Sequence, residues 1–233
     1  MYPIAFYLTM MEMGFYLMMF HFLFTFYYPI ENQLFQKYSV NMMRSLMCSY
    51  FCIQGTKYLG DVWTDVCLID ENRLTNYKNL HYQFLSYFIF DTIILFYQKY
   101  LKIEKRIRKD LLFHHILAIS SLMLIEKYGL YGLSSLICVS EGMSIVSGLK
   151  LIFMENGPKE LMKLCVRFRL LYLIFIRMLY LWPIVIYYYH TATNQCENLK
   201  DSRNMPLLLG LLGLIYHAEI RWIHSGRGEL MRI

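Results

Sequence analysis

Seven apolar stretches, each about 17 to 25 residues long, follow one another along this chain of 233 residues. They lie at about 4–28, 42–60, 82–98, 112–128, 132–153, 167–189 and 206–224. A helix rises 1.5 Å per residue, so each stretch can cross a hydrocarbon core about 30 Å thick. A composition that is 57% hydrophobic and 17% aromatic is too apolar for an ordinary soluble domain. The sequence therefore predicts an all-α integral membrane protein with about seven transmembrane helices.

Lysine and arginine are unevenly divided between the two sides of this topology. One side carries sixteen of them, including six in the run Lys99–Lys109, and the other side carries six. Cytosolic loops are enriched in Lys and Arg, so this excess predicts a cytosolic C-terminus and a lumenal or external N-terminus. The net charge of +6 then faces anionic lipid headgroups and does not indicate nucleic-acid binding. Only a short turn around Gly129 and Gly132 separates the fourth and fifth stretches, and one long buried hairpin is the alternative there.

The six cysteines show no metal-binding spacing, because no C-x-x-C pair occurs, and we predict no metal site. Cys67 and Cys196 fall in two loops on the same, non-cytosolic side of the predicted topology. An oxidising lumen permits a bond between them, so they form a candidate disulfide. Pro183 lies inside the sixth stretch, where it is expected to kink the helix and free a carbonyl near residue 179.

Ionisable side chains lie within five consecutive apolar stretches. They are Asp91, His114, His115, Glu141, Arg177, His217 and Glu219. Each would cost several kcal/mol if left unpaired in lipid, so ionisable groups in such segments usually mark a site. We expect one shared polar interior in which Arg177 pairs with Asp91 or Glu141 and a histidine bonds to a carboxylate. The alternative is a set of buried pairs that only fixes the bundle.

The adjacent histidines His114 and His115 cannot play the same role, because neighbouring residues on a helix point about 100° apart. A neutral imidazole can act as a general base or as an acyl acceptor near neutral pH. Asp91 or Glu141 is then the carboxylate that orients it. The alternative for the pair is a location at the cytosolic interface without a chemical role.

The order of several short motifs resembles the TLC-domain family of membrane proteins, which includes the ceramide synthases and the translocating-chain-associating membrane proteins. The motifs are Asn41 to Ser45, Ser86 to Asp91, Asp110 to His115, Ser140 to Ser144, Arg177 with Pro183, and Trp222. The chain departs from the ceramide synthases at Cys48, where many relatives have histidine. It also has Ser140-Glu141 and Ser144 where the ceramide synthases have His-Asp and a second Asp. This pattern is closer to the small TLC-domain-containing branch.

The resemblance implies a peripheral transmembrane helix at 1–34, a six-helix domain at 35–225 around a lipid-sized cavity, and a short cytosolic tail at 226–233. It further implies a role in lipid metabolism or homeostasis in the endoplasmic reticulum or a related endomembrane. The partners are then sphingolipids or phospholipids, with acyl-CoA as co-substrate, no bound cofactor and an unspecified oligomeric state.

Two sets of site residues follow from these inferences. The catalytic candidates are His114, His115, Asp91 and Glu141, and the substrate-binding candidates are Arg177, Ser45, Ser144, His217 and Trp222. The expected chemistry is acyl transfer from acyl-CoA. A non-catalytic lipid binder or regulator of membrane composition is the first alternative, and a cargo adaptor or translocon-associated factor is the second.

Overall fold

The computed structural model describes residues 4–27, 32–60, 66–67, 70–100, 109–196 and 205–231. The helices are α1 (Ile4–Tyr27), α2 (Asn32–Tyr58), α4 (Glu71–Tyr100), α5 (Lys109–Tyr128), α6 (Tyr131–Val139), α7 (Gly142–Asn156), α8 (Lys159–Leu171), the π-helix η1 (Tyr172–Leu181), α9 (Trp182–Gln195) and α10 (Met205–Leu230). Within these ranges every regular element is helical, which confirms the predicted all-α class.

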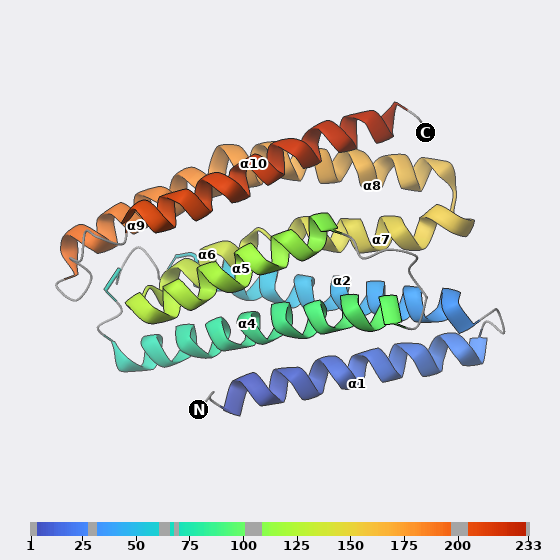
Figure 1. Ribbon diagram of the computed structural model, residues 1–233, viewed down its shortest axis with the longest axis horizontal. Helices are drawn as coiled ribbons and strands as arrows, with labels where there is room; N and C mark the ends of the chain where they lie inside the picture. Colours follow the sequence, from blue (N-terminus) through green and yellow to red (C-terminus); the bar gives the residue numbers. More distant parts are fainter. Residues whose placement is uncertain are drawn as a thin grey trace.

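The helices form long rods that lie roughly along one axis, with the two chain ends at opposite ends of the bundle (Figure 1). Two of the apolar stretches are each divided between several helical elements. The fifth stretch forms α6 and α7, and the sixth is contained in α8, η1 and α9. Three segments of the described chain are long and apolar enough to cross a membrane: Lys109–Tyr128, Tyr131–Lys150 and Lys159–Gln195. Ile4–Met19 is a shorter apolar helix. The count of seven spans thus stays a prediction.

Neighbouring helices form a closed circuit. α2 packs against α4, α4 against α5, α5 against α10, α10 against α8, α8 against α7, and α7 again against α2. α6 continues the rod of α7 and contacts α2, α4, α5 and α9, while α1 packs on the outside against α2 and α4. The core is built around large side chains such as Phe51, Phe84, Phe88, Leu122 and Leu133, all nearly inaccessible to solvent.

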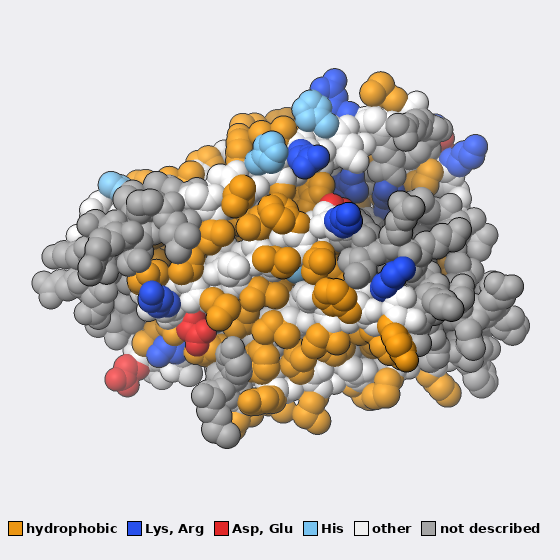
Figure 2. All heavy atoms as spheres, viewed as in Figure 1, with side chains coloured by type: hydrophobic (Ala, Val, Ile, Leu, Met, Phe, Trp, Pro, Cys, Tyr) orange, Lys and Arg blue, Asp and Glu red, His pale blue; other side chains and the backbone are white. Residues whose placement is uncertain are grey.

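The outer surface of the rods is also apolar. Hydrophobic side chains cover a broad part of the face in Figure 2. Large exposed ones include Met11, Phe22, Ile53, Phe175 and Leu179. Soluble monomers rarely expose apolar patches of more than a few hundred Å², and an apolar surface of this kind is typical of contact with lipid or with a partner protein.

The fifth rod is interrupted at Ser140 and Glu141, where α6 ends and α7 begins. The interruption leaves the Val139 carbonyl to accept a hydrogen bond of 2.5 Å from the Tyr172 hydroxyl on η1. Gly142 makes this close approach feasible, because a Cβ built there would lie 2.6 Å from Cζ of Tyr172. Glu141 is buried at this break. The hydrogen bond from Tyr172 on the neighbouring rod stabilises the interruption.

A kink is predicted at Pro183, and the structure has a π-helix, η1, just before this proline. Proline has no N–H for the carbonyl four residues earlier, and its ring clashes with that carbonyl in α geometry. η1 resolves the conflict with wider turns, in which the Trp182 N–H donates to the Arg177 carbonyl five residues back. Arg177 thus lies in a π-helical segment, a feature frequent at functional sites.

Replacement of Gly142 by alanine should force Tyr172 away from the Val139 carbonyl. We expect the variant to be about 1–3 kcal/mol less stable, the usual cost of overpacking a tight contact. Thermal unfolding of the detergent-solubilised protein measures the change.

Gly213→Ala is the matched control, because a Cβ at Gly213 meets no atom within 4 Å and alanine favours the helix. Equal stability of the two variants would show that Tyr172 does not need the space at Gly142.

Candidate functional site

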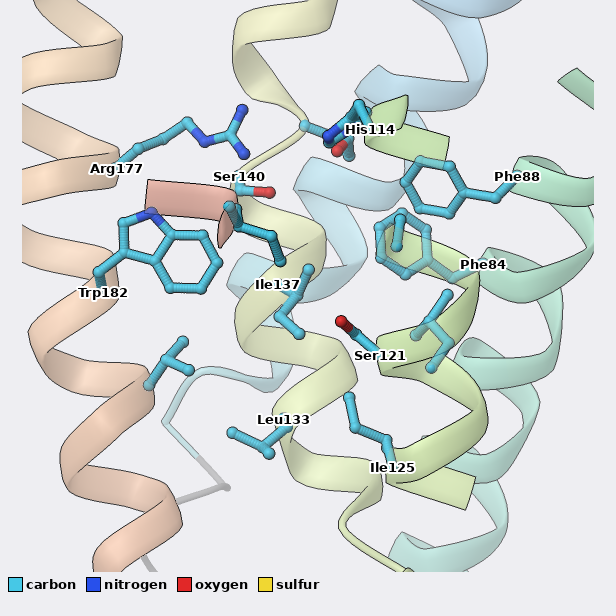
Figure 3. Close-up of a pocket in the computed structure, with 15 residues that line it drawn as sticks. Phe84, Phe88, His114, Ser121, Ile125, Leu133, Ile137, Ser140, Arg177 and Trp182 are labelled. Carbon is cyan, nitrogen blue, oxygen red and sulfur yellow. The ribbon is translucent and has the colours of Figure 1, made fainter. Parts of the chain in front are cut away.

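A pocket opens inside the bundle, walled by α4, α5, α6, η1, α9 and α10 and by the α6–α7 break. Its lining residues are Phe84, Phe88, His114, Ala118, Ser121, Leu122, Ile125, Leu133, Ile137, Ser140, Glu141, Arg177, Trp182, Val185 and Ile215. Its free volume, counted as room for the centres of water-sized spheres, is about 30 Å³, so a chain-like ligand enters only if side chains of the wall move. Figure 3 shows Arg177, Ser140 and His114 at one end and Leu133 and Ile125 at the other. The pocket is therefore amphiphilic, with an apolar body and a polar end.

Arg177 reaches this polar end from the middle of η1 and is 2% exposed. Its Nη2 lies 2.7 Å from Oε1 of Glu219 on α10, and the Trp182 indole N–H donates to the other oxygen of Glu219. The Arg177–Glu219 contact is an ion pair without good hydrogen-bond geometry, since Glu219 Oε1 has no hydrogen-bond donor. The expected pairing of Arg177 with Asp91 or Glu141 is wrong: its ion-pair partner is Glu219.

Glu141 lies at the α6–α7 break and is 3% exposed. Its Oε2 accepts a hydrogen bond of 2.8 Å from the Ser144 hydroxyl and a longer one, at 3.6 Å, from the Cys48 thiol. The Cys48 sulfur in turn lies 3.2 Å from the Tyr87 hydroxyl. Ser144 and Cys48 thus hold one oxygen of Glu141 in place in the pocket wall.

Asp91 forms a second polar cluster that lies outside the pocket lining. Its Oδ1 accepts from Arg44 Nε at 2.6 Å, and its Oδ2 lies 3.4 Å from His115 Nε2. The Thr92 hydroxyl lies 3.1 Å from His115 Nδ1. Asp91 therefore joins α2, α4 and α5, and the expected histidine–carboxylate contact is made by His115. The partner Arg44 was missed, although an arginine in an apolar stretch signals a need for such a carboxylate.

His114 points into the pocket instead. Its ring packs against those of Phe88, His115 and Trp222, with centroids 5.3 to 5.9 Å apart. Neither a hydrogen bond nor an ion pair joins it to any described residue, so its ring nitrogens are available to a ligand. The two adjacent histidines thus have different surroundings, as their 100° separation predicts.

The remaining predicted site residues are dispersed. The Ser45 hydroxyl donates to the Ile145 carbonyl at 3.3 Å where α2 packs on α7, and His217 is exposed on α10. Trp222 contacts His114 but does not line the pocket, and Ser144 touches Glu141. Of the five predicted substrate-binding residues, only Arg177 is in the pocket wall. Trp182, which the sequence did not single out, lies beside it there.

Cys67 and Cys196 lie toward one end of the bundle, and the described ends of the basic run, Lys99 and Lys109, lie toward the other (Figure 1). Cys67 and Cys196 are joined by a disulfide, with their Cα atoms 5.5 Å apart. Most of the basic run Lys99–Lys109, namely residues 101–108, lies outside the described residues. Across the described ranges, no three His, Cys, Asp or Glu side chains come close enough to share a metal ion.

Because the two histidines have separate environments, the same substitution is predicted to lower stability by different amounts at the two positions. His115→Gln disturbs the contacts with Asp91 and Thr92 and should lower stability by about 1–3 kcal/mol, the cost of leaving buried polar groups unpartnered. His114→Gln loses only ring contacts and should cost less than about 1 kcal/mol. Thermal unfolding of the two purified variants compares them, and a larger loss for His114→Gln would contradict this assignment.

The chain matches no protein-family model, no curated protein and no solved structure. The resemblance to the TLC-domain family therefore rests on the short sequence motifs alone.

Proposed function

We propose that this chain is a multi-span membrane protein of lipid metabolism whose pocket holds the acyl chain of a lipid. The three long apolar helices and the exposed apolar surface support a membrane location. The single observation that carries the rest is the pocket itself, in which an apolar body leads to a polar end at His114, Glu141 and Arg177. Pockets of this kind bind a hydrophobic body and fix its orientation with a few polar groups.

The proposed orientation in the membrane rests on two separate features. Disulfides persist in oxidising compartments, so the bond between Cys67 and Cys196 favours a lumenal location for that end of the bundle. The opposite end carries basic residues such as Lys99, Lys109 and Lys159, as cytosolic ends do. Both features favour a lumenal N-terminus, a cytosolic C-terminus and an endoplasmic-reticulum or related membrane.

The proposed reaction is acyl transfer from acyl-CoA, the chemistry implied by the TLC-like motifs. His114 would take a proton from the hydroxyl or amine of an acceptor lipid as that group attacks the thioester carbonyl. The carbon–sulfur bond then breaks, and the CoA sulfur leaves and receives the proton. Arg177 would hold the carbonyl oxygen of the thioester by a hydrogen bond. His115 and Asp91 would position the helices and not react.

A second candidate is a lipid-binding protein without catalysis, and one observation favours it. A catalytic histidine is usually oriented by a third group, but the Asp91 carboxylate contacts His115 and not His114. His114 in the pocket would then contact only a bound lipid. The two candidates share the same ligand and differ only in turnover.

Incubation of membranes with labelled long-chain acyl-CoA separates them. We expect the wild type to make a labelled lipid, and His114→Gln at matched abundance to make at least about 100-fold less, the usual contribution of a general base. Mass spectrometry identifies the labelled product and hence the acceptor class.

His115→Gln is the matched control and should retain transfer in proportion to the folded protein that remains. Equal labelling by wild type and His114→Gln would exclude catalysis by His114. If no sample contains a labelled lipid but lipid remains bound to the purified protein, the result would support the binding role.

A further inference from the structure

The guanidinium group of Arg177 has N–H donors that lack an oxygen acceptor in the described part of the chain. The Nε atom is buried and makes no hydrogen bond to the described part of the chain, and Nη1 reaches only the Met143 sulfur, at 3.9 Å. A buried donor of this kind is uncommon, because leaving it unpaired is costly. The guanidinium group points toward Ser140 and His114 in Figure 3. A ligand in the pocket can therefore supply the missing acceptor.

The charges around Arg177 limit what that acceptor can be. Glu219 is 0% exposed and already neutralises the guanidinium through the ion pair at 2.7 Å. Glu141, in the same pocket wall, adds either no charge or a second negative one. An imidazole such as His114 is mostly neutral at neutral pH. The polar end of the pocket thus has no spare positive charge to balance an anion.

A fatty carboxylate would accordingly be placed beside Glu219 with no cation of its own. Like charges close together in a site of low dielectric constant repel strongly. A neutral carbonyl oxygen satisfies the free Nε donor equally well and adds no charge. Such oxygens occur in esters, amides and thioesters.

We propose that the pocket binds its acyl ligand through a neutral carbonyl oxygen held by Arg177, and that it discriminates against the free fatty carboxylate. The proposal rests on the proposed function and specifies its ligand. It makes Glu219 a specificity-determining residue, because Glu219 removes the net positive charge that would otherwise attract fatty acids. Free fatty acids in the membrane would then not occupy the pocket, which would stay accessible to acyl esters, amides and thioesters.

Photocrosslinking of the purified full-length protein tests the proposal. Two probes share one alkyl chain that carries a diazirine and differ only at the head, a methyl ester in one and a free acid in the other. Crosslinks are mapped by mass spectrometry to peptides containing pocket residues such as Phe88 or Leu133. At neutral pH the ester should label these peptides at least about tenfold more than the acid.

The variant Glu219→Gln leaves Arg177 with an unbalanced positive charge, so the ratio of ester to acid labelling should fall severalfold. Glu160→Gln removes the same charge at an exposed position on α8 and should leave the ratio unchanged. Size-exclusion chromatography checks that each variant is folded. The wild-type ratio remains a full test if Glu219→Gln does not fold.

Acid labelling equal to or stronger than ester labelling in the wild type would overturn the neutral-carbonyl proposal while leaving the pocket as an acyl site. An unchanged ratio in folded Glu219→Gln would overturn the role of Glu219. Labelling of pocket peptides by neither probe would contradict the proposed function itself.

Discussion

Charge pairing between helices decides how this bundle is assembled. Asp91 on α4 holds Arg44 of α2 and His115 of α5, and Glu219 on α10 holds Arg177 of η1 and Trp182 of α9. Because a lone charge is costly in an apolar interior, each pair fixes the rotation of the helices that carry it. Removal of one partner leaves the other uncompensated, so these pairs constrain the bundle more than any single apolar contact.

The two clusters, around Asp91 and around Glu219, differ in their position relative to the pocket. The Asp91 cluster ties three helices together away from the pocket lining, whereas the Arg177 cluster is in the pocket wall. The break between α6 and α7 and the π-helix η1 bring Glu141 and Arg177 to the same end of that pocket. Both distortions depart from regular α-helix where the chain gains polar groups for the interior. The irregular segments of the helices thus carry Glu141 and Arg177, two of the polar residues in the pocket wall.

The sequence predicted the location of each rod, because hydropathy over about 20 residues depends on composition and not on the neighbours of a helix. The sequence also predicted that Cys67 and Cys196 lie on the same side of the membrane, because this depends only on the number of helices between them. The partner of Arg177 and the histidine that enters the pocket were not predictable, since both depend on the rotation and register of packed helices. A shift of one residue turns a side chain by 100°, enough to exchange His114 for His115.

The central claim is that the pocket holds an acyl chain, and native mass spectrometry of the protein extracted from its own membrane tests it most directly. Wild type should carry one acyl-bearing lipid, and Leu133→Trp, which fills the apolar end of the pocket, should lose it while remaining folded. The same bound lipid in both proteins would place the lipid on the outer surface and contradict the claim.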